Sequence, residues 1–408
     1  MKITYIVGNG FDIHLGLNSR YIDFYNWLDL DENKKKFKTN SIAKNISTYV
    51  DEKRKNEMKE ISPSNWESKI DWSDFEDALR LLVESYSRQA DYEDDLEKLI
   101  YDLDELNIAM SQYLSEETEE LYKHLNFNSD TVEKSLNAPL NKIPSERLIK
   151  LNNVLRAEFQ NHSPKAISSD LSFINFNYTF LLRDFIKNTN EFNIDKVYEN
   201  LVSKKVVLNK NILYPNGKFN DTPILGIGSE YDLPDGLNIS QEQKIILCKD
   251  VYANYRSDGR IDQIKTRLEQ ADLIICYGLS LGISDAIFIS QVLENLTKHS
   301  NQTAIFIMYD ENFDITDQRY KSVKNKRIVK ERLIDRYAWR HPNIDEEQLK
   351  SLKKILDNQV IIQFDNGVKS DENSKNFDYF PYESKANENV GKSKQNDDKF
   401  KNMQIEIN

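Results

Sequence analysis

The chain has 408 residues, which is enough for one large domain with an insertion or for two domains. Charged residues make up 30% of it and hydrophobic residues 39%, a balance that supports a core but leaves a very polar remainder. The net charge of -12 at pH 7 disfavours nucleic acid as a partner, because neutralisation of phosphate by basic side chains drives that affinity.

The chain opens with a strand–turn–helix pattern. Lys2 to Val7 is an apolar run that predicts a strand, Gly8 to Gly10 predicts a turn, and residues 17–28 predict a helix. This unit is the usual entry to a doubly wound sheet. The opening apolar run is too short for a signal peptide, and no window approaches the roughly 20 apolar residues of a membrane span, so no membrane partner is expected.

Residues 34–164 differ from the segments on either side. They are acidic, rich in leucine and tyrosine, and poor in glycine and proline. Between residues 92 and 124 the leucines recur at steps of three and four, as on one face of a helix. We therefore expect residues 34–164 to form a large α-helical insertion.

From residue 165 onward, short apolar runs alternate with helical patterns. Strands are expected at 171–175, 205–208, 212–214, 223–227, 272–277, 303–309 and 360–364, and helices at 179–186, 240–255, 261–270, 284–296 and 346–356. This alternation predicts an α/β fold with a mainly parallel, doubly wound, Rossmann-like sheet formed by residues 1–33 and 165–365. Residues 366–408 carry too little apolar surface to order themselves and predict a disordered tail.

The first candidate binding motif is the glycine turn after the opening strand. Glycine permits positive φ and lets a phosphate or ribose approach backbone N–H groups. The expected nucleotide-binding residues here are Gly8, Asn9, Gly10, Phe11, Asp12 and Gly16. The alternative is a tight turn without a ligand, with Asp12 as a helix cap.

The second motif is an asparagine pair at the end of the predicted strand 171–175. Binding residues of open parallel sheets gather at the carboxyl ends of strands, and side chains two residues apart point to the same side. Asn177 could therefore hold a ribose hydroxyl or orient a water, with Tyr178 beside it. The alternative is that Asn175 and Asn177 only cap and turn the chain.

A second strand–turn–helix unit appears late in the chain. Gly278 and Ser280 follow the apolar run 272–277, and Asp285 precedes a predicted helix. Ser280 can donate to a phosphate or ribose, and a helix N-terminus favours an anion. All three are expected to contact the nucleotide, unless this segment is a tight turn that Asp285 caps.

The segment 71–79 combines acids with aromatic residues. Ser73 and Glu76 have the spacing of a capping box, and Trp72, Phe75 and Leu79 would then pack on one face. In the alternative reading, Asp74 or Glu76 faces the cleft as a catalytic carboxylate.

The sequence contains neither a recognisable metal-binding motif nor a P-loop. The five histidines are scattered, and none has a cysteine or second histidine at metal-ligand spacing, so no metal is expected. The chain also lacks the G-x-x-x-x-G-K-[ST] string of P-loop proteins. Two cysteines, Cys248 and Cys276, cannot make a disulfide framework and predict a reduced, cytoplasmic compartment.

Taken together, these strings resemble the abortive-infection AbiH family of bacterial antiphage proteins. The resemblance rests on G-N-G-F-D with a following G-L and Tyr21, on W-x-x-F-E at 72–76, on F-N-Y-T at 176–179 and on G-L-S-L-G at 278–282. Family membership implies that the protein senses a phage-derived trigger and arrests the infected cell.

The glycine and asparagine motifs are also similar to those of sirtuin-like NAD-binding domains. That similarity implies NAD or a related nucleotide as ligand, with Asn177 at the ribose, although Thr179 stands where sirtuins have aspartate. Asn216 occupies the place of the histidine general base, and asparagine cannot accept a proton near neutral pH. Two functions remain open: an NAD glycohydrolase-like enzyme using Asn177, Asn216 and Glu76, or a non-catalytic nucleotide-sensing module that acts through a partner or a homo-oligomer.

Overall fold

A seven-stranded sheet forms the centre of the molecule. The computed structural model describes residues 1–46, 48–49, 72–88, 93–149, 151, 169–194, 205–220, 225–234, 239–256, 259–282, 285–309, 319–365, 379 and 383–384. The strand order is β4-β5-β3-β1-β6-β7-β8. The bounds are β1 Lys2–Val7, β3 Ser169–Asn175, β4 Glu191–Asn193, β5 Lys205–Leu208, β6 Leu273–Tyr277, β7 Thr303–Tyr309 and β8 Val360–Asp365.

The sheet is parallel throughout except at one edge. The pairs β1–β3, β1–β6, β3–β5, β6–β7 and β7–β8 are parallel, and only β4–β5 is antiparallel. The expected α/β class and mainly parallel sheet are therefore confirmed. The three-residue β4 was not expected, because it is too short to give a periodic pattern.

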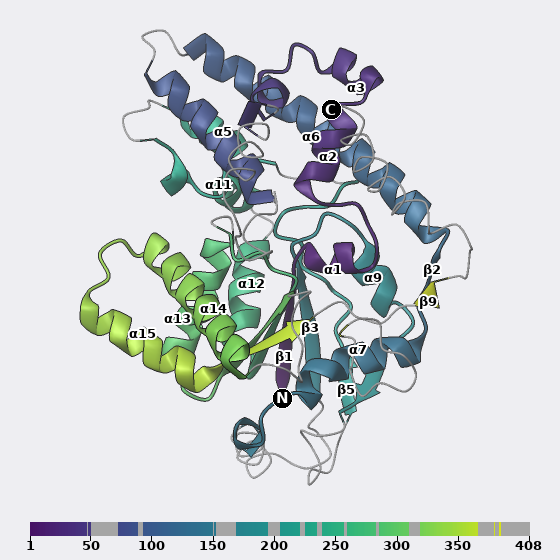
Figure 1. The fold of residues 1–408 in the computed structure, drawn as a ribbon, viewed down its shortest axis with the longest axis vertical. Helices are drawn as coiled ribbons and strands as arrows, with labels where there is room; N and C mark the ends of the chain where they lie inside the picture. The colour runs from purple at the N-terminus through teal and green to yellow at the C-terminus, as the bar shows by residue number, and fades with distance from the viewer. Residues whose placement is uncertain are drawn as a thin grey trace, which may run out of the picture.

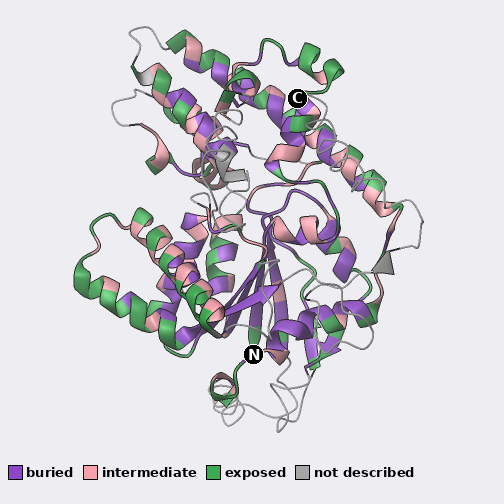
Figure 2. Ribbon diagram, in the orientation of Figure 1, coloured by how far each residue is buried: buried purple, intermediate pink, exposed green. Residues whose placement is uncertain are grey.

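Helices cover both faces of the sheet. Ile3, Tyr5 and Val7 of β1 share one core cluster with α7 (Ser129–Asn141) and α9 (Leu181–Ile186). Ile6 points the other way, into a cluster with four helices: α12 Arg260–Gln270, α13 Ala286–Lys298, α14 Arg319–Arg340 and α15 Glu346–Gln359. Because strand side chains alternate between faces, burial on both faces makes the strands apolar along their whole length (Figure 2).

A helical lobe lies beyond the carboxyl ends of the strands (Figure 1). A third core cluster holds it together. Its helices are α2 Tyr21–Leu28, α5 Trp72–Ser87, α6 Glu93–Tyr122, α10 Gln241–Leu247 and α11 Lys249–Tyr255, with α3 Asp31–Lys36 at the edge. Among the described residues, no helix is both long and apolar enough to span a membrane.

The single helix expected over 240–255 is divided into α10 and α11. Cys248 between them is extended, at φ -115° and ψ 121°, and forms a β-bridge with Ile227. This long-range pairing outweighs the local helical preference of the sequence.

Some elements cross the ranges expected from the sequence. Helix α7 falls in the expected insertion but packs on the sheet, whereas α2 falls in the expected core range but packs in the lobe. Tyr379, inside the expected tail, is 1% exposed, and its hydroxyl donates to Gln363 Oε1 at 3.1 Å. Nearby, β9 (Glu383–Ser384) pairs with β2 (Leu125–Asn126), so the disordered-tail prediction does not hold at these residues.

Candidate functional site

The two glycine turns meet at the carboxyl ends of β1 and β6, which are neighbours in the sheet. The Gly8 amide donates to the Tyr277 carbonyl at 2.8 Å, and the Gly10 amide donates to the Gly278 carbonyl at 2.9 Å. Helix α1 (Gly10–His14) begins directly from this contact. The turns expected from the sequence therefore lie on one edge of the sheet, as parallel strands require.

Close backbone packing explains why these positions are glycine. A Cβ on Gly10 would lie 2.5 Å from Gly278 Cα, and one on Gly8 would lie 2.6 Å from the Gly278 carbonyl oxygen. Gly278 also has a φ of +70°, in the left-handed region. The sequence predicts that a ligand approaches the backbone at these glycines. In the structure each glycine turn fills that space for the other.

The other residues of the first turn serve its conformation. The Asn9 side chain donates to the Ser19 carbonyl at 2.8 Å and accepts from the Ser19 hydroxyl at 2.7 Å. Phe11 is fully buried, with its ring 5.8 Å from that of Phe185. Gly16 has a φ of +97° in the loop that leads to α2.

Asp12 links the first turn to the end of β3. Its carboxylate accepts from Asn177 Nδ2 at 2.9 Å and from the Thr179 hydroxyl at 2.7 Å. Asn9, not Asp12, is the N-cap residue of α1, so the capping alternative for Asp12 is wrong. Burial raises the pKa of Asp12 to about 7 from its ordinary 3.8, and the two hydrogen bonds only partly oppose that rise.

Three buried polar atoms near Asp12 have no hydrogen-bond partner within the described part of the chain. They are Asn175 Nδ2, Asn177 Oδ1 and the Tyr214 hydroxyl. Burial raises the pKa of Tyr214 to about 12, although the adjacent Asn175 side chain lowers it without reaching hydrogen-bond geometry. We call the group Asp12, Asn175, Asn177, Thr179 and Tyr214 the polar corner.

Asn216 lies beside this corner, and its side chain is hydrogen-bonded to the backbone. Its Nδ2 donates to the Phe176 carbonyl at 3.2 Å, which ties the 214–217 turn to the end of β3. An amide in this bond can hold backbone in place, but it cannot accept a proton.

Glu76 of α5 is paired with a lysine that no motif had indicated. Lys249 Nζ of α11 lies 2.5 Å from Glu76 Oε1, and both side chains are largely buried. Burial works to lower the pKa of Lys249, but the charges of Glu76 and Tyr178 outweigh it and the pKa is raised. The buried Tyr178 hydroxyl also interacts with Lys249, and burial raises its pKa. The side chains of Trp72, Ser73 and Asp74, and with them the expected capping box, lie outside the described residues.

Ser280 and Asp285 contact each other after β6. The Ser280 hydroxyl donates to Asp285 Oδ2 at 3.0 Å, and Asp285 occupies the N-cap position of α13 without a side-chain cap bond. Between them, Leu281 has a φ of +56°, and its carbonyl accepts from Arg336 of α14 at 2.8 Å. A hollow lined by Phe176, Leu279, Phe288 and Cys276 lies next to Asp285.

The described residues contain no group of histidine, cysteine and acidic side chains that could hold a metal ion. Cys248 and Cys276 are free thiols, both buried, and burial raises the pKa of each. Their chemistry is therefore that of packed apolar side chains.

Lys249 and Tyr214 are the residues that sequence reasoning missed. Lys249 stands in no motif, and Tyr214 stands two residues before Asn216 but was given no role of its own. The only local signal was the expected strand at 212–214, which appears as a parallel bridge between Leu213 and Ile174.

Comparison with known protein families gives a match over most of the chain. The family model described as "Bacteriophage abortive infection AbiH" matches residues 4–309. No curated protein matches the chain. The matched region contains the last four residues of β1, all of β3 and β6, both glycine turns and the whole polar corner.

Proposed function

The chain belongs to the bacteriophage abortive infection AbiH family, and we propose that it serves phage defence by binding a nucleotide at the polar corner without consuming it. Membership of the family points to the abortive-infection role. The nucleotide ligand is inferred from the polar corner and from the strand order of the sheet.

The unsatisfied atoms of the polar corner carry the proposal. Leaving a buried donor or acceptor unpaired costs about 1–3 kcal/mol, and three such atoms belong to residues at the end of β3 or in the segment that bridges to it. They comprise an amide donor, an amide acceptor and a phenolic hydroxyl that can do either. A ribose diol offers matching donors and acceptors within one small group.

The strand order supports this location. Counted along the chain, the six parallel strands lie in the order 3-2-1-4-5-6, which is the order of dinucleotide-binding, doubly wound Rossmann sheets. We infer a Rossmann-like fold. In such sheets ligands bind outside the carboxyl ends of the strands, near the place where the order reverses, which here is between β1 and β6. The glycine turns fill the space directly between these two strands, and the polar corner lies next to it, at the ends of β1 and β3.

The three residues expected to be catalytic favour binding over turnover. Asn216 is held by a backbone carbonyl, Glu76 is held by Lys249, and Asn177 is oriented by Asp12. A carboxylate paired with a buried ammonium is a weak base, because the pairing stabilises its charged form.

NAD hydrolysis is the second candidate, and one observation favours it. The pKa of Asp12 lies at about 7, which suits a group that exchanges a proton near neutral pH. Asn177 would then hold the ribose while Asp12 acts on a water. The proposal places either activity in the cytoplasm, downstream of a phage-derived trigger.

A ligand panel tests the proposal. We expect NAD, ADP-ribose or adenine nucleotides to raise the melting temperature and to bind in calorimetry, with no release of nicotinamide from NAD. Asn177→Ala should abolish binding and phage protection together. Thr179→Val is the matched control, because it also removes one hydrogen bond to Asp12 but leaves the unpaired atoms in place.

The binding and nicotinamide measurements distinguish the two candidate functions. Absence of binding by the whole panel contradicts the proposal, as does undiminished binding by Asn177→Ala. Release of nicotinamide that Asp12→Asn abolishes assigns the hydrolase function instead.

A further inference from the structure

Charge is segregated on α6 and α14, the two longest helices among the described residues. Helix α14 carries nine lysines and arginines against two acidic residues, although the whole chain has a net charge of -12. Helix α6 carries eleven acidic residues against one lysine. Helix α6 lies in the helical lobe and α14 on the sheet, so the two do not neutralise each other within one molecule (Figure 1).

Large apolar side chains stand exposed inside both charged faces. On α6, an outer stripe runs through Glu97, Tyr101, Asp104 and Ile108, in which Tyr101 is 66% and Ile108 is 68% exposed. The first turns of α14 expose Lys324 and Arg327 together with two apolar residues, Tyr320 at 81% and Val323 at 67%. Apolar anchors bordered by charge are typical of protein interfaces.

The charges in these faces are available to a partner. Glu97, Asp104 and Lys324 make no ion pair within the described segments, and Arg327 reaches only Glu331 of its own helix, at 3.6 Å. Such exposed charges steer association and select the partner, because a matching face attracts them and a like-charged face repels them.

We propose that the basic face of α14 docks on the acidic face of α6 in a second copy of this chain. A nucleic acid would match α14 but would leave the acidic face, with Tyr101 and Ile108, unexplained. A second copy accounts for both faces at once, because each molecule carries the complement of its own surface.

A two-fold arrangement is the natural form of this contact. In a two-fold dimer each copy uses both of its faces, so the contact occurs twice and the assembly closes. A contact along the whole of α14, which is about 33 Å long, would cover roughly 330 Å² in a strip about 10 Å wide. Two such strips give roughly 660 Å² on each copy, close to the roughly 800 Å² per partner of a stable interface.

A charge-swap experiment with the full chain tests the dimer. By light scattering after gel filtration at about 0.15 M salt, we expect twice the mass of one chain, falling to the single-chain mass at about 1 M salt. The double variants Lys324→Glu/Arg327→Glu and Glu97→Lys/Asp104→Lys should each be monomeric alone. Mixed in equal amounts, they should form a heterodimer, because each then meets a complementary face.

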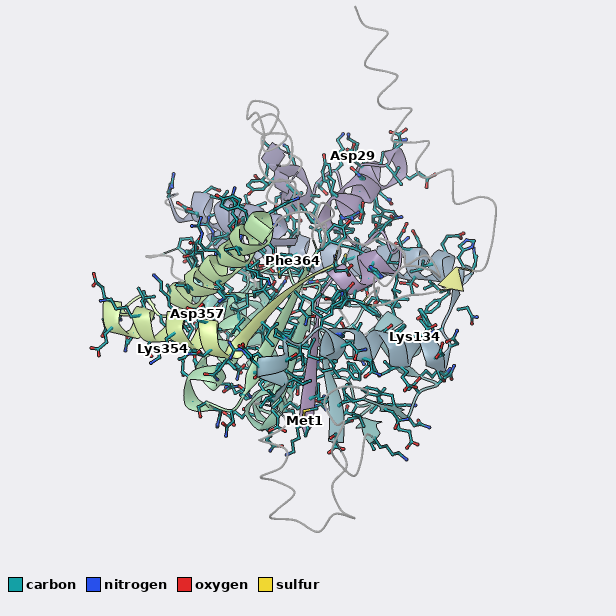
Figure 3. All side chains as sticks on the ribbon, turned by 60° about the horizontal axis from the view of Figure 1, so that its bottom comes forward. Met1, Asp29, Lys134, Lys354, Asp357 and Phe364 are labelled. Carbon is teal, nitrogen blue, oxygen red and sulfur yellow. The ribbon has the colours of Figure 1, made fainter. Side chains whose placement is uncertain are left out.

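A control variant separates the face from the general effect of charge. Lys134→Glu makes one such charge reversal on α7. In Figure 3 Lys134 lies on the other side of the view from Lys354 of α15, a helix that packs on α14. This variant should leave the dimer intact. A wild-type chain that stays monomeric, a double variant that still dimerises, or a mixture that does not associate overturns the proposal. A monomer that binds a short RNA through Lys324 and Arg327 assigns the basic face to nucleic acid instead.

Discussion

Asp12 is a carboxyl group that the fold removes from water and then places against two donors of a neighbouring segment. Burial raises the pKa of Asp12 to about 7. In the unfolded chain this carboxyl has its ordinary pKa of 3.8 and loses its proton near that pH. The folded protein therefore holds a proton there at pH values where the unfolded chain has lost it. Holding the proton lets Asp12 satisfy its neighbours without an uncompensated buried charge.

This difference predicts a pH-dependent stability. As the pH rises from about 4 to about 7, the contribution of Asp12 falls by up to about 4 kcal/mol, and above that range it stays constant. Asp12→Asn removes the titration, so the variant should gain stability relative to the wild type across this range. Urea midpoints of both proteins at several pH values measure the change, and a difference that does not vary with pH contradicts a raised pKa.

At the scale of elements, the contact between the two glycine turns determines how β1 and β6 end. Gly278 has a φ of +70° and would place a Cβ 2.8 Å from the backbone of Gly10 and Phe11. Gly259, before α12, has nearly the same φ of +66°, but within the described part of the chain a Cβ there would meet only the Gln263 side chain, at 3.9 Å. Both glycines therefore have a positive φ, but only Gly278 is packed closely against backbone atoms of another turn.

An alanine comparison separates these two effects. Gly259→Ala should cost about 1 kcal/mol of unfolding free energy, the strain of a left-handed residue with a side chain. Gly278→Ala should cost about 1–3 kcal/mol more, because the turns must move apart. Chemical denaturation of both variants measures the difference, and equal losses would mean that the turns are not tightly packed.

The sequence predicts the elements best where the pattern is long and local. The apolar run 303–309 gives β7 with its observed bounds, and the leucine spacing gives α6 within two residues. Helix α14 was not predicted because its many charged residues hide a weak apolar face. The break between α10 and α11 at Cys248 was not predicted because it depends on a bridge to Ile227. The AbiH resemblance is confirmed, whereas the sirtuin likeness stays a prediction.

The candidate site could be predicted only in part, because most of its contacts join segments that are distant in the sequence. Strand ends indicated where polar residues gather, and the structure indeed brings Asp12 and Asn177 together. No local pattern could show that Gly10 and Gly278 fill each other's space, or that Lys249 would reach Glu76. Those facts depend on distances between segments more than 150 residues apart.

On the scale of the whole molecule, a buried network of Glu76, Lys249 and Tyr178 connects the helical lobe with the carboxyl end of β3. Lys249 of α11 touches Glu76 of α5 and interacts with Tyr178, which follows β3. Because these three residues come from separate segments, the network sets how the lobe sits over the polar corner.

Breaking this pair should be costly. Lys249→Met should lower the unfolding free energy by about 3–5 kcal/mol, because the Glu76 carboxylate loses its cation, and Glu76→Gln in that background should restore part of the loss. Lys244→Met provides the control, since Lys244 pairs with Glu230 at 3.3 Å on the surface and should cost under about 1 kcal/mol. Urea unfolding measures all of these, and a loss for Lys249→Met as small as for Lys244→Met would contradict a structural role for the pair.

The burial of both thiols gives the molecule a practical property. Cys248 is 0% and Cys276 is 2% exposed, so maleimide reagents, which need an accessible thiolate, should leave the native protein unmodified. Cysteines introduced at Leu30, which is 56% exposed in the helical lobe, and at Lys134 of α7, whose side chain is 66% exposed, would then be the selective attachment points for fluorophores or spin labels. The distance between the two labels could follow the lobe relative to the sheet in solution without first removing either natural thiol.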